Sequence, residues 1–90
     1  MRFEWDEQKA HANLTKHGIS FEEAVTVFGD PLSDTFPDPD HSLNEHRFII
    51  LGSSDSGKIL VVAHTDIDAT VRIISAREAT ATERKAYEES

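Results

Sequence analysis

Two apolar segments separated by a short polar turn limit the fold of this chain more than any other feature of its sequence. RFIILG (47–52) and KILVVAHT (58–65) flank SSDSG, a hairpin signal with Gly57 at the end of the turn. Residues 48–51 and 59–63 are apolar on both sides of an extended chain, as central strands are when both faces of a sheet are covered. The sequence therefore predicts an α+β fold, with helices packed on a sheet.

The segment before these strands predicts two short helices in succession. Asp6 is a good N-cap for a helix that runs to about residue 17, where Gly18 ends it in a left-handed conformation. Ser20 and Glu23 have the spacing of a capping box for a second helix. The apolar face of that helix consists of Phe21, Ala24, Val25 and Phe28. Together the two helices form a hairpin that can cover one face of the sheet.

The other segments complete one domain over residues 1–90. Residues 3–5 and 32–36 are predicted as short strands, VRIISAR (71–77) as the last strand, and the segment from Thr80 onward as a helix. We therefore expect a twisted antiparallel sheet of about four strands, with an N-terminal helical hairpin and a C-terminal helix. The C-terminal helix or another chain must cover the second face, because an exposed apolar sheet face is an interaction site or a cause of aggregation.

The chain is acidic overall, but its charges are unevenly distributed. The formal net charge of −8 argues against broad, non-specific nucleic-acid binding. Residues 17–46 hold seven acids and no Lys or Arg, whereas residues 47–90 hold six Lys or Arg and seven acids. A local basic patch can therefore exist in the second half. The absence of cysteine, the charged start MRFEWDEQK and the lack of a membrane-spanning apolar segment favour a soluble cytoplasmic protein.

Two arginines on the last predicted strand are the first candidates for chemistry. Side chains alternate along a strand, so Arg72 and Arg77 share a face only if a bulge intervenes or Arg77 lies past the strand end. One interpretation is structural: Arg72 pairs with an acid across the sheet, and Arg77 caps an edge. The other is a phosphate clamp, because a guanidinium makes bidentate contacts with oxyanions, and Arg47 and Arg84 could join it.

Three further features have both a structural and a functional interpretation. His64 interrupts an apolar strand and is either a core residue or a proton donor or acceptor near the arginines. Trp5 is either a core residue or a platform on which a base stacks. The loop DPDHSLNEH (38–46) holds Asp38, Asp40, His41, Glu45 and His46, but at no defined metal-site spacing, so no metal or other cofactor is predicted.

Four motifs occur together in the order that is typical of one bacterial protein family. They are W-D-x-x-K (5–9), K-H-G-I-S-F-E-E-A (16–24), E-x-R-F (45–48) and R-I-I-S-A-R-x-A-T-x-x-E-R (72–84). With these motifs the chain resembles the BrnT family of type II toxins over nearly its whole length. The resemblance implies a RelE-like fold and a ribonuclease that stops growth by cutting RNA. It also implies a ribbon-helix-helix antitoxin of the BrnA type, which forms a heterotetramer with the toxin and binds promoter DNA.

The resemblance also implies roles for individual residues. Arg47, Arg72 and Arg77 are expected to stabilise the phosphorane that forms when the ribose 2′-hydroxyl attacks its own phosphate without a metal. Glu45 and His64 are candidates for proton transfer. Expected RNA contacts are Trp5, Lys9, Lys58 and Arg84.

Two departures from the family pattern favour an alternative function. The chain has Ala81 and Thr82 where relatives often carry basic residues, and its net charge is strongly negative. A toxin relative with weak or no catalysis would keep the fold and act with its antitoxin as a protein-interaction and co-repressor module. A third interpretation, a metal-dependent hydrolase that uses the loop at 38–46, requires stoichiometric metal in the purified protein.

Overall fold

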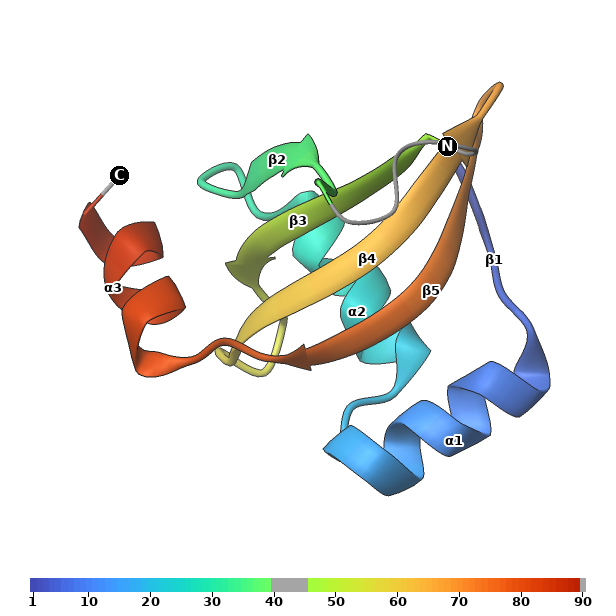
Figure 1. The fold of residues 1–90 in the computed structure, drawn as a ribbon, viewed down its shortest axis with the longest axis horizontal. Coiled ribbons are helices and arrows are strands. Elements are labelled where there is room, and N and C mark those ends of the chain that lie inside the picture. Colours follow the sequence, from blue (N-terminus) through green and yellow to red (C-terminus); the bar gives the residue numbers. More distant parts are fainter. Residues whose placement is uncertain (40–45, 90) are drawn as a thin grey trace.

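One five-stranded sheet organises the chain. The structure is a computed structural model that describes residues 1–39 and 46–89. The sheet has the strand order β1-β5-β4-β3-β2, and Figure 1 shows α2 crossing behind it while α3 lies at the end of the sheet far from the N-terminus. The elements in chain order are β1 (Arg2–Glu4), α1 (Glu7–His17), α2 (Phe21–Thr26), η1 (Val27–Gly29), β2 (Asp34–Pro37), β3 (Arg47–Ser53), β4 (Ile59–Ile67), β5 (Thr70–Glu78) and α3 (Ala81–Glu89).

The sheet differs from the prediction at one edge. β3, β4 and β5 form the expected antiparallel meander, and β2 pairs antiparallel with β3. The fifth strand is β1, which pairs in parallel with β5 and places Phe3 opposite Val71. Hairpin turns make neighbouring strands antiparallel, but β1 and β5 lie far apart in the sequence and no turn sets their relative direction. The prediction of about four strands, all antiparallel, is therefore wrong.

The ends of α1 are those expected from its capping residues. The Asp6 carboxylate accepts hydrogen bonds from the backbone N–H groups of Gln8 and Lys9, at 2.8 and 3.1 Å. At the other end Gly18 adopts a left-handed conformation with φ 71°, and its N–H donates to the carbonyl of Leu14. Both contacts satisfy backbone groups that a helix leaves unpaired at its ends.

The second helix is shorter than predicted and uses its capping glutamate differently. The Ser20 hydroxyl accepts from the N–H of Glu23 at 3.0 Å, as in a capping box. The Glu23 carboxylate instead accepts from the hydroxyls of Ser54 and Ser56 at 2.7 and 2.5 Å, and so ties α2 to the β3–β4 turn. The helix ends at Thr26 and continues as the 3₁₀ turn η1.

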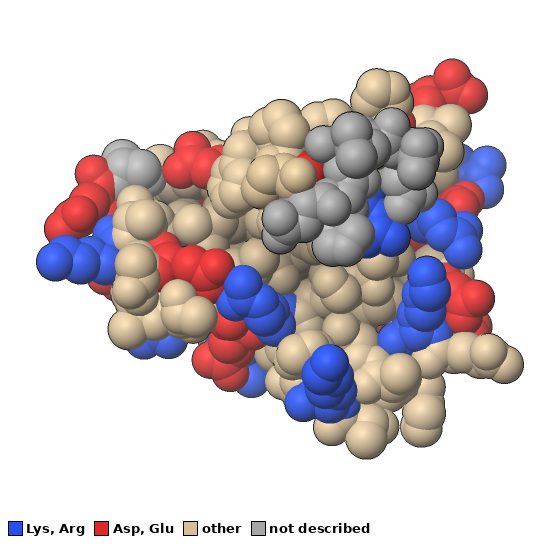
Figure 2. All heavy atoms as spheres, viewed as in Figure 1, with Lys and Arg blue, Asp and Glu red and all other residues tan. Residues whose placement is uncertain are grey.

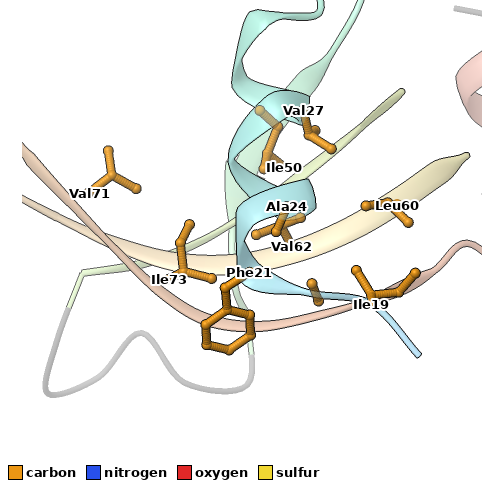
Figure 3. Packing of buried hydrophobic residues seen from close by; sticks show 10 residues of the cluster. Ile19, Phe21, Ala24, Val27, Ile50, Leu60, Val62, Val71 and Ile73 are labelled. Atoms are coloured by element: carbon orange, nitrogen blue, oxygen red, sulfur yellow. The ribbon is translucent and has the colours of Figure 1, made fainter. Parts of the chain in front are cut away.

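The helical hairpin buries the main core on one face of the sheet. Gly52 on β3 permits close approach of η1, because a Cβ there would lie 2.9 Å from Val27 Cγ1. A fully buried aliphatic or aromatic side chain contributes about 1.5–3 kcal/mol relative to an exposed one. The core cluster, drawn in Figure 3, consists of Ile19, Phe21, Ala24, Val27, Ile50, Leu60, Val62, Val71, Ile73 and Ala76.

The opposite face of the sheet, which we call the outer face, is covered by α3 at one end. Leu51, Val61 and Ala79 are buried there, and Tyr87 of α3 packs against them. Toward the other end, Ile49 and Ala63 are only half-buried. The predicted C-terminal helix is therefore present, but part of the outer face stays accessible. In the described part of the chain no helix is long and apolar enough to cross a membrane.

Candidate functional site

A bulge in β5 places both candidate arginines on the outer face. The register between β4 and β5 shifts between Ala63 and His64, where Ile74 is an extra residue on β5. The alternation of side chains resets at this point. Arg72 and Arg77, which a regular strand would point to opposite sides, therefore share the outer face, which is the condition that the sequence left open.

Arg47 and Arg72 lie in one row across three strands. Thr65 on β4 is the register partner of Arg47 on β3 and also of Arg72 on β5. Neighbouring strands are about 4.8 Å apart, so the backbones at the two arginines are separated by about 10 Å. Both side chains are long enough to reach one anion bound between them.

A cleft of about 340 Å³ opens beside this row. Its lining includes the basic side chains of Lys9, Arg47 and Arg72, together with His46 and Asp66. Three permanent positive charges at one cleft are notable in a chain with a net charge of −8. Figure 2, which looks onto the outer face, shows Lys and Arg side chains around a central area of uncharged residues. Basic side chains at a cleft raise the local concentration of anionic ligands, so this cleft is the best candidate for an anion site.

Arg72 also has a carboxylate partner inside the protein. Its Nη1 donates to Glu4 Oε2 at 2.9 Å, and the two side chains are 44% and 45% exposed. Exposed ion pairs of this kind contribute about 0–1 kcal/mol, because both groups remain hydrated and screened. The structural interpretation of Arg72 is therefore realised, but the pair is weak enough for a phosphate to compete with Glu4.

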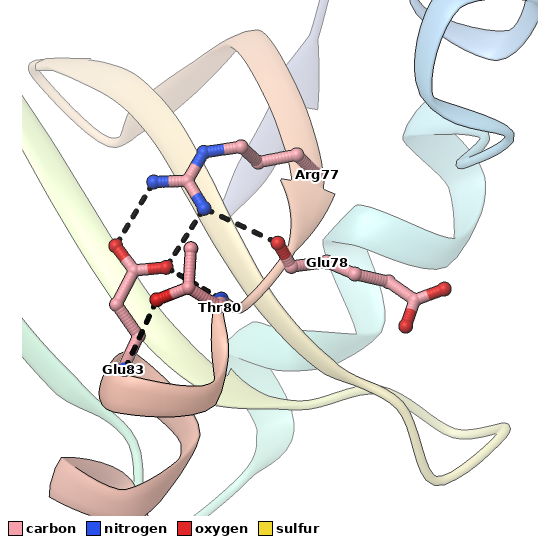
Figure 4. A network of polar contacts seen from close by, with 4 residues as sticks. All are labelled: Arg77, Glu78, Thr80 and Glu83. Carbon is pink, nitrogen blue, oxygen red and sulfur yellow. Dashed lines mark hydrogen bonds and ion pairs between the residues drawn. The ribbon is translucent and has the colours of Figure 1, made fainter.

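Arg77 is bound at the other end of the outer face by α3. Its Nη1 and Nη2 donate to the two carboxylate oxygens of Glu83 at 2.7 and 2.9 Å (Figure 4). Glu83 also accepts from the N–H of Thr80, and its own N–H donates to the Thr80 hydroxyl, which completes a capping box at the start of α3. The hydrogen bonds from Arg77 lower the pKa of Glu83 to about 2, although partial burial acts in the opposite direction.

The three guanidiniums converge only in part. Arg77 lines a second cavity of about 220 Å³, and Arg47 lines both this cavity and the cleft. Arg72 lines the cleft but not the second cavity. The β4 partners of Arg72 and Arg77 are Thr65 and Val61, so the two backbones are about 13 Å apart along the sheet.

His64 lies on the helix side of the sheet, away from the arginines. Its side chain is 2% exposed and contacts the rings of Phe28 and Phe48, with centroid distances of 4.9 and 5.9 Å. Nδ1 lies 3.0 Å from Asp66 Oδ1, and Nε2 finds no hydrogen-bond partner among the described residues. Burial lowers the pKa of His64, and the carboxylate of Asp66 opposes this shift. This placement agrees with the structural interpretation of His64.

The other predicted RNA contacts are scattered. Lys9 lines the cleft. Trp5 packs against the core, edge-to-face with Phe21 at 6.0 Å between ring centroids. Lys58 is exposed in the β3–β4 turn, at the opposite end of β3 from Arg47, and Arg84 is exposed on α3.

Most residues of the loop at 38–46, which one interpretation of the sequence treats as a metal site, lie outside the described residues. Asp40, His41 and Glu45 lie outside the described residues. Asp38 is buried beside β3, where its N–H donates to the carbonyl of Arg47 at 3.0 Å. Within residues 1–39 and 46–89, no group of three His, Asp or Glu side chains could hold a metal ion together.

Two residues of the cleft were not predicted as parts of an anion site: Thr65 was not considered, and His46 was considered only as a possible metal ligand in the loop at 38–46. Thr65 is the register partner of both Arg47 and Arg72, and His46 lines the same cleft. The position of His46 directly before Arg47 was a usable signal. Thr65 gave none, because its proximity to Arg72 depends on the β4–β5 pairing.

Comparison with known proteins identifies the family. A family model described as the ribonuclease toxin BrnT of type II toxin-antitoxin systems matches residues 5–83. The crystal structure of the ribonuclease toxin BrnT of Brucella abortus has the same fold, with a TM-score of 0.70 and 24% identity, over 89% of this chain and 97% of that chain. No curated protein matches the chain. Because the family model spans most of the 90 residues, the chain belongs to the BrnT family of ribonuclease toxins of type II toxin-antitoxin systems.

Proposed function

We propose that this protein is a metal-independent endoribonuclease toxin that binds the scissile phosphate of RNA in the basic cleft. The observation that supports this proposal most directly is the row of Arg47, Thr65 and Arg72, with Lys9 lining the same cleft. Although the chain is acidic overall, the positive charges at this cleft attract a phosphodiester. The family of the chain supports ribonuclease activity.

The proposed reaction is attack of the ribose 2′-hydroxyl on the neighbouring phosphorus. A bond forms between the 2′-oxygen and phosphorus, and the bond from phosphorus to the 5′-oxygen breaks. A base takes the 2′-hydroxyl proton and an acid protonates the leaving 5′-oxygen, so the products are a 2′,3′-cyclic phosphate and a 5′-hydroxyl. Arg47 and Arg72 stabilise the negative charge that develops on the non-bridging oxygens.

The proton-transfer groups of this reaction are chosen by position. His46 lines the cleft, and Glu45 remains a candidate from its motif. The carboxylate of Asp66 is not a candidate, because it lies 3.0 Å from His64 Nδ1 on the helix side of the sheet. We do not assign this role to His64, because its ring is buried on the other face of the sheet. Arg77 remains a candidate for phosphate binding outside the cleft.

The test of this proposal is cleavage of RNA by purified, antitoxin-free protein in excess chelator. We expect cleavage to persist and the products to carry cyclic phosphate ends. Arg72→Gln should lower the rate by about a hundredfold or more, the usual effect of removing one preorganised electrostatic donor. Lys16→Gln is the matched control, because it removes the same charge at the far end of α1. Loss of activity in chelator, 3′-hydroxyl products, or equal rates of the two variants contradicts the mechanism.

The partner that we propose is a BrnA-type antitoxin with a ribbon-helix-helix fold. The half-buried apolar residues Ile49, Ala63 and Ile74 on the outer face support a protein partner. In this proposal toxin and antitoxin form a cytoplasmic heterotetramer, which contacts promoter DNA through the antitoxin alone. Co-expression with the neighbouring reading frame, followed by mass measurement of the complex in solution, tests the stoichiometry.

One observation favours a second candidate function, a catalytically weak co-repressor module. Arg72 and Arg77 are each paired with a carboxylate, Glu4 and Glu83, within the chain itself. Expression of the chain alone in a bacterium distinguishes the two functions. Growth arrest that disappears in Arg72→Gln supports the enzyme. Harmless expression, together with intact antitoxin binding and promoter repression, supports the module.

A further inference from the structure

The carboxylate of Glu83 contacts Arg77 in the geometry that a phosphate would adopt. The two parallel hydrogen bonds, at 2.7 and 2.9 Å, use both terminal nitrogens of the guanidinium. This planar fork matches the oxygens of carboxylates and phosphates equally well. The side chain of Arg77 is 41% exposed, so solvent and anions can reach it. Glu83 is therefore an internal competitor for any anion that approaches Arg77.

The helix that carries Glu83 is lightly attached to the sheet. No described residue of α3 is buried. Two of its side chains contact the rest of the protein. Glu83 binds Arg77, and Tyr87 packs against the cluster of Leu51, Val61 and Ala79 and donates its hydroxyl to Asp30 at 2.5 Å. Segments with few buried apolar contacts open locally at a low free-energy cost. Movement of α3 away from Arg77 leaves the main core intact, because that core lies on the other face of the sheet.

The cavity at Arg77 adjoins the basic cleft. It is lined by Ser75 and Arg77 at one side, and Arg47 is common to this cavity and the cleft. The two cavities are therefore neighbours along the outer face, on the same side of the sheet as the row of Arg47 and Arg72. An RNA strand with one phosphate at this row can continue along the outer face to Arg77.

We propose that Arg77 is a second phosphate-binding position for RNA, which Glu83 occupies in the free protein, so that α3 must release Arg77 when RNA binds. This inference rests on the proposed function, because it extends the same RNA site. The carboxylate of Glu83 then reduces the affinity for RNA beyond its effect on net charge. Removal of that carboxylate exposes one more phosphate contact.

The test compares Glu83→Gln with Glu88→Gln. Both variants remove one negative charge from α3, and Glu88 is exposed. Glutamine at position 83 preserves the capping box with Thr80, so the start of α3 is retained. Binding of a short single-stranded RNA is measured by fluorescence anisotropy over a range of salt concentrations. The RNA carries 2′-O-methyl groups, which prevent 2′-hydroxyl attack during the measurement.

We expect Glu83→Gln to bind this RNA about threefold or more tightly than Glu88→Gln. Its plot of log affinity against log salt should be steeper by about 0.7, the value for one additional phosphate contact on a single strand. Adding Arg77→Ala to Glu83→Gln should abolish both gains. Equal affinities and slopes for the two single variants overturn the inference and leave the proposed function standing. Absence of RNA binding in every protein, wild type included, removes both.

Discussion

The side-chain amide of Asn13 on α1 forms two hydrogen bonds with the backbone of Ala76 on β5. Nδ2 donates to the carbonyl of Ala76 at 2.8 Å, and Oδ1 accepts from its N–H at 3.1 Å. Nδ2 also donates to the carbonyl of Ile19 at 2.9 Å. β1 pairs with β5 only as far as Arg72. At Ala76, beyond the end of β1, Asn13 forms the hydrogen bonds that a neighbouring strand would otherwise form with this edge of β5. Arg77 follows Ala76 in the sequence, so this contact fixes the backbone next to Arg77.

Replacing Asn13 should destabilise the protein strongly. Asn13→Ala leaves the buried backbone N–H of Ala76 without a partner, and each unsatisfied buried group costs about 1–3 kcal/mol. We expect a loss of about this size in the free energy of unfolding, measured by urea denaturation. Gln8→Ala is the matched control, because it removes an exposed amide from the same helix. Equal losses in the two variants would show that the Asn13 contact is not important for stability.

Gly52 should not tolerate a methyl group. A Cβ at this position would lie 2.9 Å from both Ser33 Cβ and Val27 Cγ1, which is closer than carbon atoms pack. Gly52→Ala should therefore lower the free energy of unfolding by about 1–3 kcal/mol, the usual effect of overpacking. The control is Gly29→Ala, where nothing lies within 4 Å of the added atom. The measurement is the thermal unfolding midpoint of both variants and of the wild type. A midpoint of Gly52→Ala equal to that of the wild type would contradict the close packing of η1 on β3.

His64 should make stability depend on pH below neutrality. Burial lowers the pKa of His64 in the folded protein below its ordinary value of 6.5. Between the folded and the unfolded pKa, the unfolded state binds more protons, so stability rises with pH in this window. The contribution of neutral His64 to the free energy of unfolding is fully present above about pH 6.5. It declines as the pH falls, by at most about 1.4 kcal/mol per pH unit.

Substitution of His64 separates this effect from other titrations. His64→Phe should flatten the dependence of the free energy of unfolding between pH 5 and 7, because the ring packing with Phe28 and Phe48 is kept but the ionisable group is lost. Glu83, with its pKa of about 2, contributes stability that is lost only below about pH 4.5, outside this window. A slope that persists in His64→Phe assigns the effect to other groups.

Tyr87 should titrate at unusually high pH. Its hydroxyl donates to the carboxylate of Asp30, which raises the pKa of Tyr87 to about 12. The chain has a single tyrosine, so the ultraviolet absorbance of tyrosinate reports this residue alone. In the native protein we expect a midpoint near pH 12, and in denaturant a midpoint near the ordinary value of 10.0. Asp30→Asn should lower the native midpoint. A native midpoint near 10 would show that α3 is not held by this contact.

The fold was predictable where it depends on neighbours in the sequence. The capping residues Asp6 and Ser20, the stop at Gly18 and the turn at Gly57 act within a few residues of themselves. The apolar segments of β3 and β4 likewise predicted central strands. The parallel pairing of β1 with β5 was not predictable, because it joins residues almost 70 positions apart and no turn connects them.

The residue types needed for an anion site, and the family, could be inferred from the order of the motifs in the sequence. Only the tertiary structure decided how those residues are grouped. A single extra residue, Ile74, turns Arg72 and Arg77 to the same face, and the register of β4 joins Arg72 to Arg47. The physical reason is that a strand alternates its side chains with a period of two, so its function depends on a pairing register that local sequence does not contain.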